Sequence, residues 1–143
     1  MKIKGEIILI DKDDFEREFY HEILKRLKLS TEVRHFRKPL EGLDYLKKCK
    51  EKIFVVISLI DFGPGNITGL ELKRKINEDP HLLLKAVPFV FMTYLDDKDT
   101  IEEAYKLNIQ GYFKKPMTLV ESERLISTLF SYWICNLRPD DAL

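Results

Sequence analysis

The stretch IILIDKDDF (residues 7–15) joins an apolar run directly to a cluster of charged residues. Ile7–Ile10 are all aliphatic, which is typical of a parallel strand buried on both faces of its sheet. Asp11–Asp14 follow at once, and in open parallel sheets ligands bind where the strands end. Because Lys12 stands among the acids, the stretch indicates a metal site, a phosphate site, or a disabled version of one.

Short β-rich runs alternate along the chain with helical patterns. Five runs favour strands: Ile7–Ile10, Glu32–Phe36, Phe54–Ile60, Phe89–Met92 and Gly111–Phe113. Apolar residues recur at helical spacing in five further segments: Phe15–Leu27, Leu40–Leu46, Leu70–Ile76, Ile101–Leu107 and Leu125–Leu137. NEDP (residues 77–80) is expected to end the third helix. We therefore predict an α/β fold, (βα)5, with a doubly wound five-stranded parallel sheet.

The composition predicts one folded domain. The 143 residues are 45% hydrophobic, and we place the domain at residues 1–138, with a polar tail at residues 139–143. Lys plus Arg and Asp plus Glu number 24 each, whereas nucleic acids and anionic membranes select basic surfaces. Neither is therefore an expected partner.

The sequence also favours a cytoplasmic protein. Its longest apolar runs are too short to span a bilayer, and its N-terminus lacks the h-region of a signal peptide. Cys49 and Cys135 have no CxxC spacing, so we interpret them as free thiols in a reducing compartment.

Polar residues follow four of the five predicted strands. Asp11 follows the first strand, Asp61 the third, Thr93 the fourth and Lys115 the fifth. Because the carboxyl ends of parallel strands meet at one edge of a sheet, these side chains should converge there. The loop after Asp61, FGPGNITG (residues 62–69), is rich in glycine and can turn tightly beside a ligand.

These four pieces together resemble the response-regulator receiver domain of two-component signalling. They are Asp11 in LIDKDD, Asp61 in LIDFGPGNITGLEL, Thr93 in VFMTY, and Lys115-Pro116 in GYFKKPM. The resemblance covers nearly the whole chain and implies a flavodoxin-like fold with strand order 2-1-3-4-5. In the family, the aspartate eight residues before the glycine of GLE accepts the phosphoryl group, and here that residue is Asp61.

The resemblance also implies roles for the other residues at the strand ends. Asp11, Asp61 and the backbone carbonyl of Gly63 would hold Mg²⁺. Lys115 would pair with one phosphoryl oxygen, and Thr93 would hydrogen-bond another. The family implies three further features, which are a rotamer switch at Tyr112 coupled to Thr93, a cis bond at Lys115–Pro116, and no enzymatic turnover.

Lys12 is the departure from the family pattern, which normally has a second acid there as a direct metal ligand. The net charge of Asp11, Lys12, Asp61 and Lys115 together is about zero, so we expect weak Mg²⁺ binding. Lys12 could turn into solvent or pair with Asp61. Asp13 is expected to form a capping box with Glu16 rather than to replace the missing ligand.

Two functional readings stay open within the family. The first is a stand-alone phospho-acceptor served by a histidine kinase or a histidine phosphotransfer protein. It would signal through its fourth predicted helix (Ile101–Leu107), fifth strand (Gly111–Phe113) and fifth helix (Leu125–Leu137). The alternative is a degenerate receiver that binds partners without phosphorylation, and Lys12 favours it. A phosphatase with Asp11 as nucleophile and Asp13 as acid is disfavoured, because no acidic strand end follows Lys115.

Overall fold

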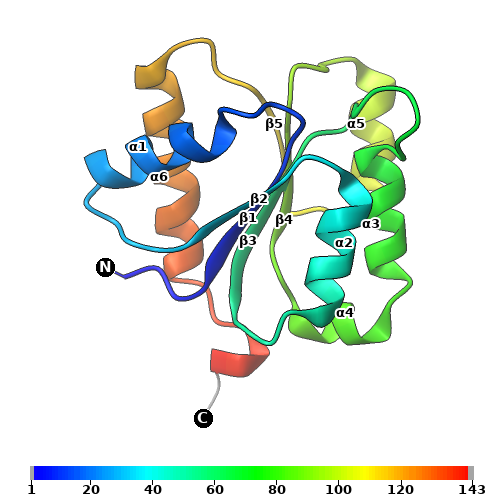
Figure 1. Cartoon of the computed structure of the whole chain (residues 1–143), viewed down its shortest axis with the longest axis horizontal. Coiled ribbons are helices and arrows are strands. Elements are labelled where there is room, and N and C mark those ends of the chain that lie inside the picture. Colours follow the sequence, from blue (N-terminus) through cyan, green and yellow to red (C-terminus); the bar gives the residue numbers. More distant parts are fainter. Residues whose placement is uncertain (1, 142–143) are drawn as a thin grey trace.

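The computed structural model describes residues 2–141 and contains a five-stranded parallel sheet (Figure 1). Its strands are β1 (Glu6–Ile10), β2 (Val33–Phe36), β3 (Ile53–Ser58), β4 (Phe89–Thr93) and β5 (Gly111–Lys114). They are ordered β2-β1-β3-β4-β5, and every neighbouring pair is parallel. The predicted fold class and strand order are confirmed, and each strand lies where a β-rich run indicates one.

Helices cover both faces of the sheet in the doubly wound manner. The helices α1 (Glu16–Arg26) and α6 (Leu119–Ile134) lie on the left of the sheet in Figure 1. The other face is covered by α2 (Pro39–Lys48), α3 (Gly69–Asn77), α4 (Pro80–Lys85) and α5 (Lys98–Tyr105). A short 3-10 helix, η1 (Pro139–Asp141), follows α6. None of the helices within residues 2–141 combines the length and hydropathy that a bilayer crossing requires.

The short helix α4 was not predicted from the sequence. NEDP does end α3, but a new helix begins within the same four residues. Asp79 accepts hydrogen bonds from the backbone N–H groups of His81 and Leu82, and Pro80 occupies the first helical position. An N-cap followed by proline favours helix initiation, so this motif both ends one helix and starts the next.

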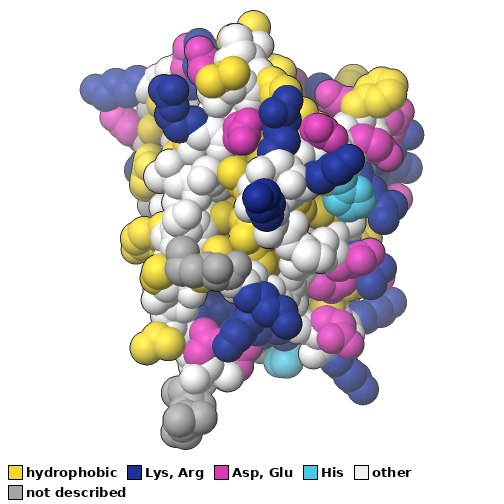
Figure 2. Space-filling model, turned by 90° about the vertical axis from the view of Figure 1, so that its left-hand side faces the viewer, with side chains coloured by type: hydrophobic (Ala, Val, Ile, Leu, Met, Phe, Trp, Pro, Cys, Tyr) yellow, Lys and Arg dark blue, Asp and Glu magenta, His cyan; other side chains and the backbone are white. Residues whose placement is uncertain are grey.

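The sheet separates two hydrophobic layers. Alternate residues of β1 point to opposite faces, with Ile7 and Leu9 in the layer under α1 and α6, and Ile8 and Ile10 in the other. All four side chains are at most 1% exposed, which explains why the strand is apolar throughout. The outer surface is mixed in charge: Figure 2 shows Lys and Arg side chains interspersed with Asp and Glu on one face.

Glu6 is a buried carboxylate at the start of β1. Its side chain accepts hydrogen bonds from Tyr45 of α2 and from Arg34 of β2, the latter at 2.6 Å. Burial raises the pKa of Glu6, but these hydrogen bonds outweigh it, and the net pKa lies below the ordinary 4.5. The ionised carboxylate therefore stabilises the junction of β1, β2 and α2.

We expect Glu6→Gln to make the free energy of unfolding less sensitive to acid. The folded-state pKa of Glu6 is lowered, so its stabilising contribution is present above pH 4.5 and is lost as the pH falls through the folded pKa. Urea unfolding at several pH values should show the advantage of the wild type over Glu6→Gln shrinking below about pH 4.5. Glu41→Gln, at an exposed position of α2, is the control. A difference that stays constant with pH would contradict this assignment.

Candidate functional site at the carboxyl edge of the sheet

The parallel register brings the predicted polar residues to one edge of the sheet. Ile10 of β1 pairs with Ser58 of β3, and the backbone N–H of Leu59 donates to the carbonyl of Ile10. The chain therefore leaves β1 and β3 at the same edge, towards Asp11 and Asp61. His35 of β2 contacts the backbone carbonyl of Asp11 through Nε2 at 2.7 Å, which fixes the start of the loop after β1.

A buried ion pair joins the ends of β1 and β5. Lys115 Nζ lies 2.7 Å from Asp11 Oδ2, and the two residues are 8% and 6% exposed. The backbone N–H of Lys115 also donates to the carbonyl of Thr93 at 2.8 Å. Burial lowers the pKa of Lys115, but the hydrogen bond and charge of Asp11 outweigh it, and the net pKa is raised. Lys115 is therefore held as a cation, with Asp11 as its main partner.

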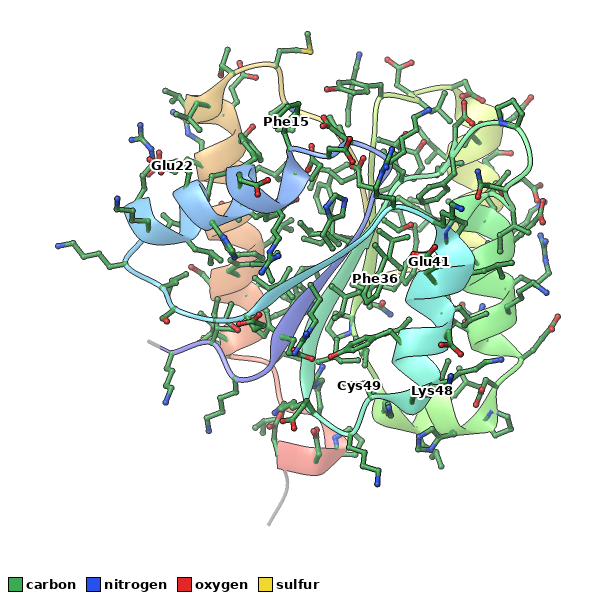
Figure 3. All side chains as sticks on the ribbon, viewed as in Figure 1. Phe15, Glu22, Phe36, Glu41, Lys48 and Cys49 are labelled. Carbon is green, nitrogen blue, oxygen red and sulfur yellow. The ribbon has the colours of Figure 1, made fainter. Side chains whose placement is uncertain are left out.

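Glu16 is a third acid of this site, although its sequence position predicts a role in a helix cap. Its Oε1 lies 3.5 Å from Lys115 Nζ, and burial raises the pKa of its carboxyl. The predicted capping box of Asp13 and Glu16 is wrong. Asp11 Oδ1 accepts from the N–H of Asp13, and Asp13 Oδ1 accepts from that of Phe15, each at 2.9 Å. These two consecutive turns delay the helix, so α1 begins at Glu16, and Phe15 lies at its start (Figure 3).

Lys12 lies outside this buried cluster. Its side chain is exposed, and it forms no ion pair with any residue between positions 2 and 141. Lys12 was expected either to turn into solvent or to pair with Asp61, and in the structure its side chain lies in solvent. The neighbouring Asp14 instead pairs with Arg37 at 2.8 Å.

Asp61 is exposed near the start of the loop that joins β3 to α3. Its Oδ1 accepts from the backbone N–H of Gly63 at 2.9 Å, which leaves Oδ2 without a hydrogen-bond partner in the described chain. Gly63 and Gly65 have φ values of 85° and 84°, which non-glycine residues rarely adopt. The glycines thus allow the chain to turn under Asp61 while the carboxylate stays accessible.

Gly69 fixes the return of this loop into α3. Its backbone N–H donates to the carbonyl of Ile60 at 2.8 Å, and an added Cβ would lie 2.1 Å from the carbonyl oxygen of Leu59. We expect Gly69→Ala to lower the free energy of unfolding by about 1–3 kcal/mol, because a backbone oxygen cannot rotate away from the methyl group. Gly42→Ala is the control in urea unfolding, since its Cβ would meet side-chain atoms of Ile10, the nearest being Cδ1 at 2.6 Å, and no backbone atom. Equal losses in the two variants would refute the steric explanation.

Thr93 and Tyr112 meet at a common residue, Leu95. Buried Thr93 accepts from the backbone N–H of Leu95 through Oγ1 at 3.2 Å. Half-buried Tyr112 donates its hydroxyl to the carbonyl of Leu95 at 2.7 Å. A movement of the Thr93 side chain would therefore affect the backbone of Leu95, to which the Tyr112 hydroxyl is hydrogen-bonded.

The bond between Lys115 and Pro116 does not follow the family expectation. All peptide bonds within residues 2–141 are trans, so the expected cis bond is wrong for this structure.

The donor atoms at this edge fit Mg²⁺ only in part. Within residues 2–141, no three side chains of the His, Cys, Asp and Glu types are placed to hold a metal ion. Asp61 offers a free oxygen, but Oδ2 of Asp11 is occupied by Lys115 and its Oδ1 by the N–H of Asp13. A divalent ion held between Asp11 and Asp61 would share the Asp11 carboxylate with the Lys115 ammonium and would be repelled by its charge.

Comparisons with known proteins agree with the fold described above. A sequence model of the response regulator receiver domain matches residues 7–129. The transcriptional regulatory protein CrdR of Helicobacter pylori is 34% identical over 113 residues, which are 72% of this chain and 50% of that protein. The chain thus spans about half the length of this relative.

Solved receiver structures share the fold. The phosphorylated cyanobacterial phytochrome response regulator RcpA aligns with a TM-score of 0.80 and 19% identity, over 95% of this chain and 99% of that one. The Mn²⁺-bound form of response regulator Rcp1 aligns with a TM-score of 0.76 and 18% identity, over 93% and 96% of the two chains. The magnesium-bound receiver domain of the Pseudomonas aeruginosa sensor histidine kinase PA1611 has a TM-score of 0.69 and 15% identity, over 93% and 99%.

Proposed function

The chain belongs to the response regulator receiver domain family of two-component signalling, and we propose that it is a switch that accepts a phosphoryl group on Asp61. The observation that supports this most directly is the exposed Asp61 carboxylate, with one oxygen free, at the sheet edge where Thr93 and Lys115 also lie. Carboxylates of this kind act as nucleophiles towards phosphoryl groups.

The proposed reaction is a phosphoryl transfer from a phosphohistidine. An Asp61 carboxylate oxygen attacks the phosphorus, the P–N bond breaks, and the departing imidazole nitrogen takes a proton from solvent. The product is an acyl phosphate on Asp61. Asp11, Asp61 and the Gly63 carbonyl are the groups that would hold Mg²⁺, which when bound offsets the charge of the phosphoryl oxygens.

The contacts around Lys115 and Thr93 suggest how the switch would respond. Lys115 would exchange part of its pairing with Asp11 and Glu16 for a phosphoryl oxygen. The Thr93 hydroxyl would donate to another oxygen and release the N–H of Leu95, and Tyr112 is bonded to the carbonyl of the same residue. The surface that contacts the target protein would then comprise α5, β5 and α6, which are the fourth helix, fifth strand and fifth helix predicted from the sequence.

The phosphoryl donor would be a histidine kinase or a histidine phosphotransfer protein. We place this exchange in the cytoplasm, in keeping with Cys49 and Cys135, which are both free thiols. The protein would act as a switch rather than as an enzyme that turns over a substrate.

The degenerate receiver is the second candidate, and a specific observation favours it. Lys115 is already paired with Asp11 and contacts Glu16, while Lys12 removes the usual second acid. A site in which the lysine is already paired with internal acids should have lower affinity for Mg²⁺ and for a phosphoryl group. The domain would then bind partners in one fixed conformation.

Labelling with a small phosphodonor separates these two candidates. The wild-type protein, incubated with acetyl phosphate and Mg²⁺, is expected to form an adduct that survives acid but is cleaved by hydroxylamine, as acyl phosphates are. Intact-protein mass spectrometry would follow its formation. If no adduct forms in the wild type or in Lys12→Asp, the phospho-acceptor proposal fails and the degenerate receiver is supported.

A further inference from the structure

A large cavity among the described residues lies at the opposite edge of the sheet from Asp61. It has a volume of about 760 Å³ and is bounded by α3, α4, the beginnings of β4 and β5, and the last turns of α6. Apolar side chains form most of its wall, among them the buried Leu82, Phe89 and Trp133. Its lining includes Lys73 and Lys85 but no aspartate or glutamate, so its charge is positive.

Lys73 is a buried cation without an acidic partner in the described chain. It is 7% exposed, its Nζ donates to Asn77 Oδ1 at 2.8 Å, and the Phe89 ring centroid lies 5.5 Å away. None of the ion pairs within residues 2–141 involves it, whereas the other buried lysine, Lys115, has two acids. An ammonium has three donors, and burial without a counter-charge is costly, as the lowered pKa of Lys73 reflects.

The surrounding contacts leave Lys73 as the cation that can receive a ligand. Asn77 is fixed, because its Nδ2 donates to the carbonyl of Leu107 at 2.9 Å. Lys85 already has hydrogen-bond partners at the end of α2, because its Nζ donates to the carbonyls of Leu46 and Cys49 at 3.1 and 2.9 Å. One available ammonium in an apolar cavity fits a single carboxylate with a hydrocarbon body and does not fit a polyphosphate, which needs several donors.

We propose that this cavity binds an amphipathic monocarboxylate, with the carboxylate on Lys73 and the hydrocarbon against the apolar wall. The carboxylate would supply the counter-charge that Lys73 lacks, and the cavity would bury the hydrocarbon. This site is separate from the Asp61 site, and neither proposal depends on the other.

Octanoate, 1-octanol and octylammonium are suitable probes because they share one hydrocarbon chain and differ in charge. Trp133 lines the cavity and is the single tryptophan, so its fluorescence should change and saturate with octanoate. Lys73→Met should weaken octanoate binding by about tenfold or more and leave octanol binding little changed. Lys75→Met, at an exposed position of the same helix, is the matched control and should bind octanoate as the wild type does.

A second measurement needs no variant. In protein labelled with ¹³C at lysine Cε, saturating octanoate should move the titration of the Lys73 resonance to higher pH, because a bound carboxylate stabilises the ammonium. The proposal is overturned if octanoate does not saturate, if octanol or octylammonium binds as tightly, or if Lys75→Met matches Lys73→Met. It is equally overturned if saturating octanoate leaves the pH of the Lys73 titration unchanged.

Discussion

Asp61→Asn is expected to abolish the phosphoryl adduct formed with acetyl phosphate. The amide lacks the anionic oxygen that attacks phosphorus, so the expected loss is complete rather than partial. The substitution should leave the fold intact, because Asp61 is exposed and its described hydrogen bond, with the N–H of Gly63, can be kept by the amide oxygen. Intact mass and hydroxylamine cleavage, measured side by side on the two proteins, would show the difference.

Asp14→Asn is the control for this experiment. Asp14 is also an exposed acid at the carboxyl edge of the sheet, and it pairs with Arg37 rather than with the proposed acceptor site. This variant should be labelled as the wild type is. An adduct that persists in Asp61→Asn would place the acceptor at another residue and contradict the proposed role of Asp61.

Lys12→Asp is expected to tighten Mg²⁺ binding by about tenfold or more, which corresponds to about 1.4 kcal/mol. The change replaces a positive by a negative charge beside Asp11 and restores the adjacent acids of the family pattern. A unit charge pair at ~4 Å is worth about 4 kcal/mol at an effective dielectric constant of 20. The exposure of Lys12 reduces this effect, because solvent screens its charge and the side chain can move away.

Titration calorimetry is the suitable measurement for this variant. Trp133 lies at the opposite edge of the sheet, so its fluorescence is a poor reporter of Mg²⁺ near Asp61. Lys50→Asp makes the same change in net charge at an exposed position in the loop between α2 and β3 and should leave Mg²⁺ affinity nearly unchanged. If the wild type binds Mg²⁺ as tightly as Lys12→Asp does, Lys12 has no influence on Mg²⁺ binding.

The amino-acid pattern predicted the five strands and the edge where the polar residues gather, and the resemblance to receiver domains implied the strand order. Strands buried on both faces must be apolar at every position, so the runs at Ile7–Ile10 and Phe89–Met92 were recognisable without a structure. Parallel strands also place their carboxyl ends together, which made the joint location of Asp11 and Asp61 predictable from chain order alone. The strands and their shared edge depend on local composition and on a general rule of topology, whereas the strand order was implied by the family resemblance.

Which charged groups pair at that edge depends on the three-dimensional packing of the chain. The sequence spacing of Asp13 and Glu16 fits a capping box, yet two turns formed by Asp11 and Asp13 shift the start of α1 and free Glu16 to approach Lys115. The partner of Lys115 lies 104 residues away in the chain, across the ends of two intervening strands. Charged side chains are long, and their pairing depends on burial and on distances across the fold, which no local pattern encodes.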